Sequence, residues 1–293
     1  MLRTTLLVVL ALALLGAAGI WVAGSLAMGL FGHAWEHVTP PPGIEPVVLR
    51  ASDGVELKGW WWPGSDASRA VLLLHGLGAD RIQMFPRARW LHERGYSALL
   101  FDFRGCGESG GRPSLGYGER LDVQAALDFL REKKQVGQIA LVGQSLGAAA
   151  AVMAVDHWDG VKGAVLEQLY DRLENAMRAG LRHRIGGLEP LLSPLILWQV
   201  KPRLGFSPAA LAPVERLGQA RCPVLLGYGG TDPTVTLAGL RALFAAGPSP
   251  TTLWSLQKAG HEDLFSCDPA IYKAKIGEFL GQTLGEPAGG RKP

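Results

Sequence analysis

Ser145 lies in the segment GQSLG (143–147), after the apolar run QIALVG and before a row of alanines. The run predicts a strand and the alanine-rich stretch predicts a helix, so we expect the serine at a tight, strained turn between them. Small residues at the two glycine positions let strand and helix approach each other. An ordinary glycine-flanked turn is the alternative, but the strand before the motif and the helix after it disfavour that interpretation. The pattern indicates a nucleophilic serine.

A serine hydroxyl needs a neighbouring base, and the base needs a carboxylate to orient it. His261 is the expected base because it follows the last predicted strand in the loop KAGHEDL. Asp232 is the expected acid because it follows another strand in the glycine-rich loop GYGGTDPTV. We expect Asp263 to be a surface loop residue, too near His261 in the chain to orient the ring.

Acyl chemistry also requires donors for the developing oxyanion. The backbone N–H of Leu146, directly after the serine, is one expected donor. The second is expected from the loop HGLG (75–78), where Gly76 lets the chain turn back and the Leu77 N–H points at the site. We expect His75 to brace this turn.

The elements that would position these groups alternate along the chain. A hairpin is predicted around Ser52-Asp53-Gly54, and later strands are predicted at 70–76, 96–103, 138–143, 161–167, 222–229 and 251–257. Helices are predicted at 81–94, 117–134, 146–156, 237–244 and 269–281. Such alternation predicts an α/β fold with a mostly parallel sheet and helices on both faces.

One long segment, 168–216, contains no clear strand and is predicted to form short helices of a lid. Its apolar residues would form either the lid's own core or part of an acyl pocket: Leu188, Leu191, Leu192, Leu195, Ile196, Leu197 and Trp198. We expect a disordered tail over 286–293.

The N-terminal segment carries no charged residue from Leu6 to Phe31. About 20 apolar residues cross the hydrocarbon core of a bilayer, so we expect 1–32 to be a single-pass transmembrane anchor. A signal peptide cleaved near ALALLGAAG is the alternative. Arg3 precedes the span and the next Lys or Arg is Arg50, so we expect the catalytic domain on the extracytoplasmic side.

Several other classes of protein are disfavoured. The pattern HAWEH (33–37) is similar to a zinc-protease motif, but it falls in the predicted linker 33–45 at the membrane surface. The pattern GCGESG (105–110) is similar to a dinucleotide-binding motif, but a loop follows where a helix is required. A net charge of +3 with scattered signs predicts no nucleic-acid surface. We therefore expect neither a metal nor a cofactor.

Over about residues 46–285 the sequence resembles the α/β-hydrolase superfamily. The order Ser145, Asp232, His261 is the order of the nucleophile, acid and base in that superfamily. The resemblance is carried by HGLG (75–78), DFRGCGES (102–109), GQSLG (143–147), GGTDPTV (229–235) and AGHEDL (259–264). It is strongest to membrane-associated, short-lidded acyl-thioesterases, monoacylglycerol lipases and serine aminopeptidase-like proteins.

The resemblance implies a serine hydrolase that cleaves a carboxylic ester or thioester through an acyl-enzyme, on a small or lipid-like acyl substrate. An aminopeptidase-like activity and a catalytically silent binding module are the alternatives, whereas hydrolases with a carboxylate nucleophile are disfavoured by the serine at 145. It also implies that Asp102 and Arg104 belong to a structural turn. In this fold the loops that carry Cys106 and Cys267 both follow the rim of the active site, so a disulfide between them is a further expectation.

Overall fold

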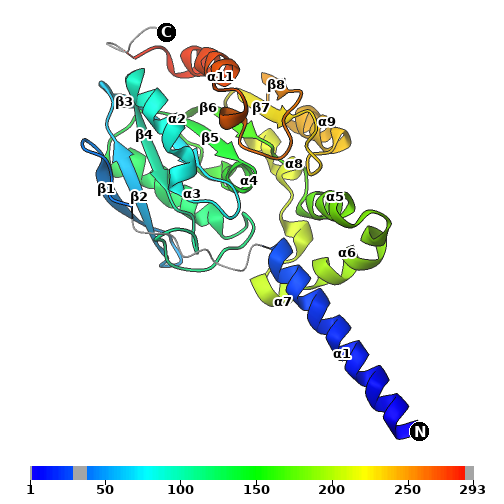
Figure 1. The fold of residues 1–293 in the computed structure, drawn as a ribbon. Coiled ribbons are helices and arrows are strands. Elements are labelled where there is room, and N and C mark those ends of the chain that lie inside the picture. The colour runs from blue at the N-terminus through cyan, green and yellow to red at the C-terminus, as the bar shows by residue number, and fades with distance from the viewer. Residues whose placement is uncertain (1, 29–37, 288–293) are drawn as a thin grey trace.

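The computed structural model describes residues 2–28 and 38–287. Its centre is an eight-stranded sheet with the strand order β1-β2-β4-β3-β5-β6-β7-β8 (Figure 1). Strand β2 is antiparallel to both of its neighbours, and all the other pairs are parallel. The strands are β1 (Glu45–Arg50), β2 (Glu56–Trp62), β3 (Asp66–Leu74), β4 (Tyr96–Phe101), β5 (Gln138–Gln144), β6 (Val161–Glu167), β7 (Val224–Gly229) and β8 (Thr251–Leu256).

Helices cover both faces of this sheet, because its central strands present apolar side chains on both sides. In β3, Leu72 and Leu74 pack into one buried cluster, and Val71 and Leu73 pack into another. The first cluster includes side chains of α3 (Glu119–Asp128), α4 (Leu146–Met153) and α9 (Leu237–Ala246). The second includes side chains of α2 (Arg81–Glu93), α10 (Leu264–Cys267) and α11 (Pro269–Leu284). The predicted α/β architecture is confirmed.

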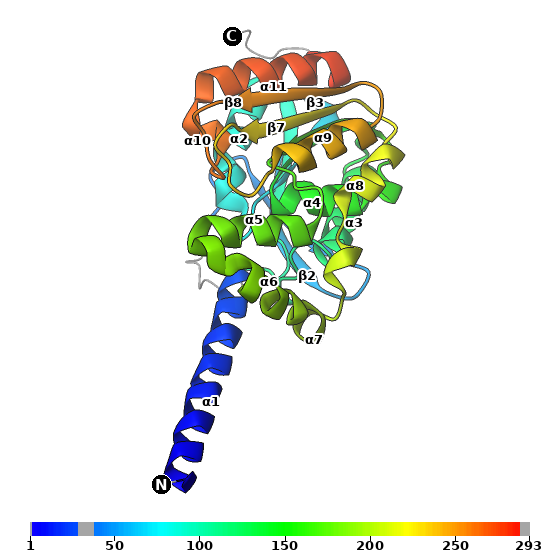
Figure 2. The same cartoon turned by 90° about the vertical axis from the view of Figure 1, so that its right-hand side faces the viewer.

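The segment between β6 and β7 forms a helical lid beside the carboxyl end of the sheet (Figure 2). A left-handed glycine ends one lid helix at Gly186, with φ +55°, and another at Gly205, with φ +81°. The lid helices are α5 (Leu173–Ile185), α6 (Glu189–Trp198), α7 (Val200–Leu204) and α8 (Pro213–Arg216).

The N-terminal helix α1 (Leu2–Ala27) projects away from the globular part, and only its C-terminal end reaches the lid (Figures 1 and 2). Residues Arg3–Leu26 form a helix long and apolar enough to cross a membrane. The HAWEH motif at 33–37 lies outside the described residues. At the other terminus, Arg69 donates to the Glu286 carbonyl at 2.7 Å and Arg94 pairs with the Glu286 carboxylate at 2.6 Å. Most of the segment 286–293, which we expect to be a disordered tail, lies outside the described residues.

Candidate active site

Ser145 occupies the turn between β5 and α4 with φ +50° and ψ −107°, a strained conformation for a residue with a side chain. The flanking glycines are required by close approach of the backbone. A Cβ at Gly143 would lie 2.8 Å from the Ala148 nitrogen, and one at Gly147 would lie 2.4 Å from the Leu74 carbonyl oxygen. This close approach of the backbone segments and the Ser145 N–H bond to the Glu167 carbonyl at 2.8 Å hold the hydroxyl at the carboxyl edge of the sheet.

The three side chains expected to act together meet at this edge. Ser145 Oγ lies 2.9 Å from His261 Nε2, and His261 Nδ1 lies 2.7 Å from Asp232 Oδ2. The Asp232 side chain is fully buried, whereas that of His261 is 27% exposed. An imidazole between a hydroxyl and a carboxylate can take the hydroxyl proton and be stabilised as an imidazolium.

Asp232 is itself oriented by its own loop. Its Oδ1 accepts hydrogen bonds from the Thr234 N–H at 2.7 Å and the Val235 N–H at 3.1 Å. These two bonds leave Oδ2 for the imidazole. The glycine-rich loop after β7 therefore fixes which carboxylate oxygen faces His261.

A cavity of about 400 Å³ is lined by Ser145 and His261, and the residues of the two expected oxyanion donors, Leu77 and Leu146, line it as well. Within the described part of the chain, neither backbone N–H of this pair donates to another residue. Two free N–H groups beside a nucleophilic oxygen suit an oxyanion. The rest of the wall is mainly apolar and comes largely from α5: Leu115, Tyr170, Leu173, Ala176, Met177 and Leu181.

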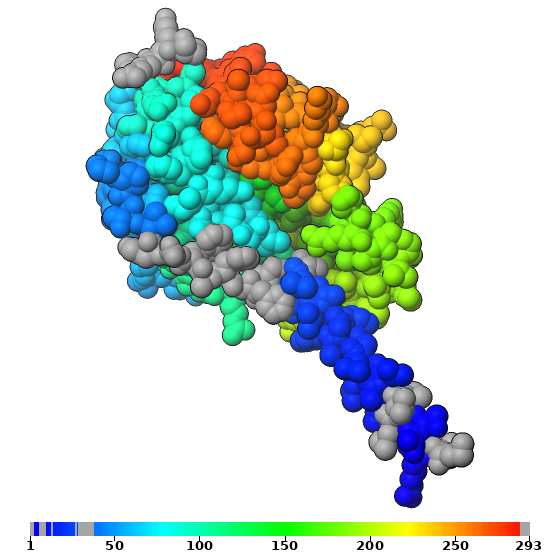
Figure 3. Space-filling view, viewed as in Figure 1, coloured from blue at the N-terminus to red at the C-terminus, as the bar shows by residue number. Residues whose placement is uncertain are grey.

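The surface is hollowed between the light green lid, the cyan α2 region and the orange segment that follows β8 (Figure 3). Arg184 of the lid and Glu262 of the histidine loop both line the cavity and are exposed. The site is thus a cleft between the sheet edge and the lid.

His75 holds the loop that carries Leu77. The His75 ring is fully buried, and its Nε2 accepts a hydrogen bond from the Phe103 N–H at 2.9 Å. Because Nε2 is the acceptor, Nδ1 carries the ring proton and donates to the Gly76 carbonyl at 2.8 Å. Burial lowers the pKa of His75 to about 4, which keeps the ring neutral. Gly78, with φ +71°, is the residue of this turn that adopts a left-handed backbone conformation.

The alpha/beta hydrolase fold model matches residues 69–178. The Mycobacterium tuberculosis protein Rv2307c is 32% identical over 247 residues, which cover 83% of this chain and 81% of that protein. The chain belongs to the α/β-hydrolase superfamily. The YfhR protein of Salmonella typhimurium is 28% identical to it over 254 residues, covering 83% and 84% of the two chains. Among solved structures, the Pyrococcus furiosus esterase Pf2001 superposes with a TM-score of 0.71 at 23% identity, over 87% of this chain and 98% of that one.

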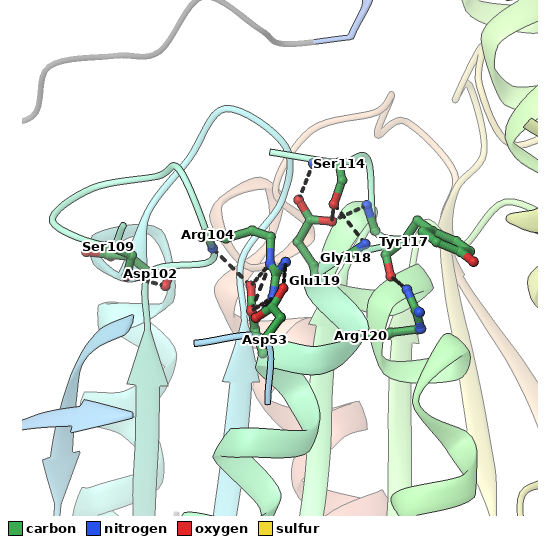
Figure 4. Close-up of polar contacts among 11 residues, drawn as sticks. Asp53, Asp102, Arg104, Ser109, Ser114, Tyr117, Gly118, Glu119 and Arg120 are labelled. Atoms are coloured by element: carbon green, nitrogen blue, oxygen red, sulfur yellow. Dashed lines mark hydrogen bonds and ion pairs between the residues drawn. The ribbon is translucent and has the colours of Figure 1, made fainter. Parts of the chain in front are cut away.

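In this superfamily member the loop after β4 is a scaffold. Arg104 contacts Asp122 and Asp53 at 2.7 Å each, and Glu119 accepts the hydroxyl and the N–H of Ser114, both at 2.6 Å (Figure 4). These pairs tie the loop to the start of α3 and to the β1–β2 turn. None of these side chains lines the cavity, which agrees with the structural role that the resemblance implied.

Asp102 braces the same loop from the side of α2. Its carboxylate accepts the Arg81 N–H at 2.8 Å and the Glu108 N–H at 2.9 Å, and it pairs with the Arg81 guanidinium at 2.5 Å. The Ser109 hydroxyl donates to the Asp102 carbonyl at 2.6 Å (Figure 4). Asp102 therefore positions backbone and does not reach the cavity.

Asp263 is not the surface loop residue that we expected. Its carboxylate pairs with Arg87, whose guanidinium also lies 2.8 Å from Glu167 Oε2 and 2.9 Å from the Tyr272 hydroxyl. Tyr272 in turn contacts the Glu167 carboxylate. Burial raises the pKa of Glu167. Burial also acts to raise the pKa of Asp263, but the Arg87 charge and the hydrogen bonds from Arg87, Ser266 and the Phe265 N–H together outweigh it and lower this pKa. This buried network joins the histidine loop to β6, whose last residue accepts the Ser145 N–H.

Gln168 was also missed by the sequence analysis, which treated it only as the first residue of the lid. It is fully buried with φ +53°, and its side chain donates to the Gly260 carbonyl at 2.7 Å. Its Oε1 accepts from Gln144 at 3.2 Å. Gln168 thus links the residue before Ser145 to the residue before His261, and no local sequence pattern indicated this contact.

The expected disulfide is wrong, because all three cysteines are free. Cys106 is half-buried near the Glu119 and Asp102 carboxylates, whereas Cys267 is exposed beside Glu262. The two thiols therefore have different surroundings although their loops both run along the rim. Burial raises the pKa of Cys106 to about 12, so this thiol stays protonated.

Proposed function

We propose that this protein is a serine hydrolase that cleaves carboxylic esters through an acyl-enzyme on Ser145. The observation that carries the proposal is the hydrogen-bonded series Ser145 Oγ to His261 Nε2 at 2.9 Å and His261 Nδ1 to Asp232 at 2.7 Å. The strained serine backbone and the two free N–H groups beside it support the same function. The esterase named among the structural neighbours is a third line of support.

In the proposed reaction, Ser145 Oγ attacks the ester carbonyl carbon while His261 Nε2 takes its proton. The Leu77 and Leu146 N–H groups hold the resulting oxyanion, and Asp232 stabilises the imidazolium. Collapse breaks the bond to the alcohol oxygen, which leaves with the proton from His261. Water then attacks the acyl-enzyme, gives its proton to His261 and releases the acid, and the proton returns to Ser145.

The cavity favours a small apolar acyl group. Its volume of about 400 Å³ is within the range of sites for small molecules, and its α5 wall is apolar. Esters and thioesters share the proposed chemistry, so both belong to the expected substrate class.

We also propose that α1 anchors the chain in a membrane, with the catalytic domain from about residue 46 on the extracytoplasmic side. The length and composition of Arg3–Leu26 support the span. The charge distribution supports the orientation, since Arg3 flanks one end and the next Lys or Arg beyond the span is Arg50.

The test uses the purified full chain in detergent, a fluorophosphonate probe and p-nitrophenyl esters of increasing chain length. We expect Ser145→Ala to abolish labelling and to lower kcat by about six orders of magnitude, as removal of a triad nucleophile does. The matched control is Ser68→Ala, an exposed serine at the opposite end of β3 that should label and turn over normally. The proposal is wrong if Ser145→Ala keeps more than about a tenth of kcat. Preferential cleavage of aminoacyl anilides would instead favour a peptidase.

A further inference from the structure

The lid helix α6 presents a row of large apolar side chains to solvent. Their spacing of three, four and three residues places them on one helical face. The lid face, as we name it, consists of Leu188 at the start of the helix (57% exposed), Leu191 (69%), Leu195 (43%) and Trp198 (70%). These residues therefore neither line the cavity nor form the core of the lid, which were the two roles weighed from the sequence.

The end of α6 is joined to α1. Gln199 donates to the Ile20 carbonyl at 3.1 Å, and a Cβ at Gly24 would lie 2.3 Å from the Gln199 Oε1, so the two segments approach closely. Arg203 of α7 donates to the Trp21 carbonyl and to the Ser25 hydroxyl, both at 2.7 Å. The Arg203 guanidinium also stacks 3.6 Å from the Trp21 ring centroid. The lid is thus attached to the C-terminal end of the proposed membrane span.

This attachment determines the height of the lid relative to a bilayer. The contacts begin at Ile20, and the part of α1 before it projects away from the domain (Figures 1 and 2). That part, 2–19, is about 27 Å long at 1.5 Å per residue, close to the ~30 Å hydrocarbon core of a bilayer. If α1 spans the membrane, α6 and α7 lie at the boundary between hydrocarbon and headgroups.

The charge of the lid suits an anionic lipid surface. Residues 173–204 contain five Lys and Arg against two Glu. One of those acids, Glu189, is already paired with Arg182 at 2.8 Å. Lys201 and Arg184 are exposed. Basic side chains beside an apolar helical face are typical of helices that lie in the membrane interface.

We propose that the lid face rests in the interfacial region of the same bilayer that α1 crosses, with the lid's basic residues near anionic phospholipid headgroups. This inference rests on the proposed anchor. Helix α5, which lines the cavity, is held against α6 because Arg178 donates to the Ser193 hydroxyl at 3.0 Å. Helices α5 and α6 alone therefore separate the cavity wall from the lipid, and the substrate class is an amphiphilic acyl ester that partitions into membranes.

The test places an environment-sensitive fluorophore on the lid face of the full chain. The variant Leu191→Cys, with the exposed Cys267 changed by Cys267→Ser, is labelled and reconstituted into phosphatidylcholine vesicles that contain phosphatidylglycerol. The matched control is Leu253→Cys in the same background, since Leu253 is likewise an exposed leucine, at 43%, but lies on the edge strand β8, away from α1 (Figures 1 and 2). Shallow doxyl-labelled lipid is the quencher, and carbonate extraction of the same vesicles reports on the anchor.

We expect strong quenching at 191, none at 253 and retention of the chain after carbonate treatment. Retention without quenching at 191 overturns the inference and leaves the anchor intact. A buried fluorophore at 191 that lipid does not quench also overturns it, because a second protein copy then covers the lid face. Release of the chain by carbonate overturns both the anchor and the inference, while labelling of Ser145 remains a separate measurement.

Discussion

Two aspartates lie near His261, and their hydrogen bonds distinguish them. Asp232 contacts the imidazole at 2.7 Å and is held by two backbone N–H groups of its own loop. Asp263 contacts Arg87 instead and also caps α10 by accepting the Phe265 N–H at 3.2 Å. At the scale of single residues, Asp232 contacts the proposed base, whereas Asp263 helps to fix the position of the loop that carries it.

Asp232→Asn is expected to lower kcat by about four orders of magnitude, because an amide favours the wrong imidazole tautomer. Asp263→Asn is the matched control: it removes charge from the Arg87 pair and should lower the melting temperature while kcat falls far less. Steady-state kinetics and thermal unfolding of both variants provide the measurement. A larger loss of kcat in Asp263→Asn than in Asp232→Asn would show that the acid is assigned wrongly.

At the scale of elements, four segments converge on one buried guanidinium. Arg87 comes from α2, Glu167 ends β6, Tyr272 belongs to α11, and Asp263 caps the start of α10. The Arg87 and Glu167 side chains are 1% and 0% exposed. A buried charge that loses its partner is costly, so the network makes the position of the histidine loop depend on the packing of two helices against the sheet.

Arg87→Met is expected to lower the free energy of unfolding by about 3–5 kcal/mol, because it leaves Glu167 buried without a cation. Arg89→Met on the same helix is the control: Arg89 is exposed, and such substitutions usually change stability by less than about 0.5 kcal/mol. Urea unfolding of the full chain in detergent measures both. Equal stability of the two variants would mean that the buried pair contributes little.

At the scale of the whole molecule, the lid connects the globular domain to the helix α1. The contacts of Gln199 and Arg203 with the end of α1 attach the lid to the proposed anchor. With α1 as the proposed anchor, this arrangement would keep the cleft close to the membrane surface.

The orientation of the chain is tested by protease added to intact spheroplasts that express it. We expect digestion of the catalytic domain from about Pro40 onward, because Arg3 favours a cytoplasmic N-terminal flank. A cytoplasmic marker protein in the same spheroplasts is the control and should stay intact. Protection of the domain until the membrane is broken would reverse the orientation.

The sequence alone was enough to predict the strands and helices of the central fold and to identify the three residues now proposed as the triad. Local backbone geometry restricts which residue types fit, and this restriction is visible in the sequence. Positions 143 and 147 are glycines because the neighbouring backbone leaves no space for a Cβ. Parallel strands end at one edge of a sheet, so residues just after them, such as Asp232 and His261, could be expected together.

The tertiary structure alone decided the contacts between segments that are distant in the chain. Arg87 and Glu167 are 80 residues apart, and Gln168 and Gly260 are 92 apart, so neither pair forms a sequence pattern. The free state of Cys106 and the exposure of Trp198 were likewise undecided, since burial depends on what packs against a side chain. Periodicity reports that a helix has an apolar face; only packing decides whether that face meets a core, a substrate or a lipid.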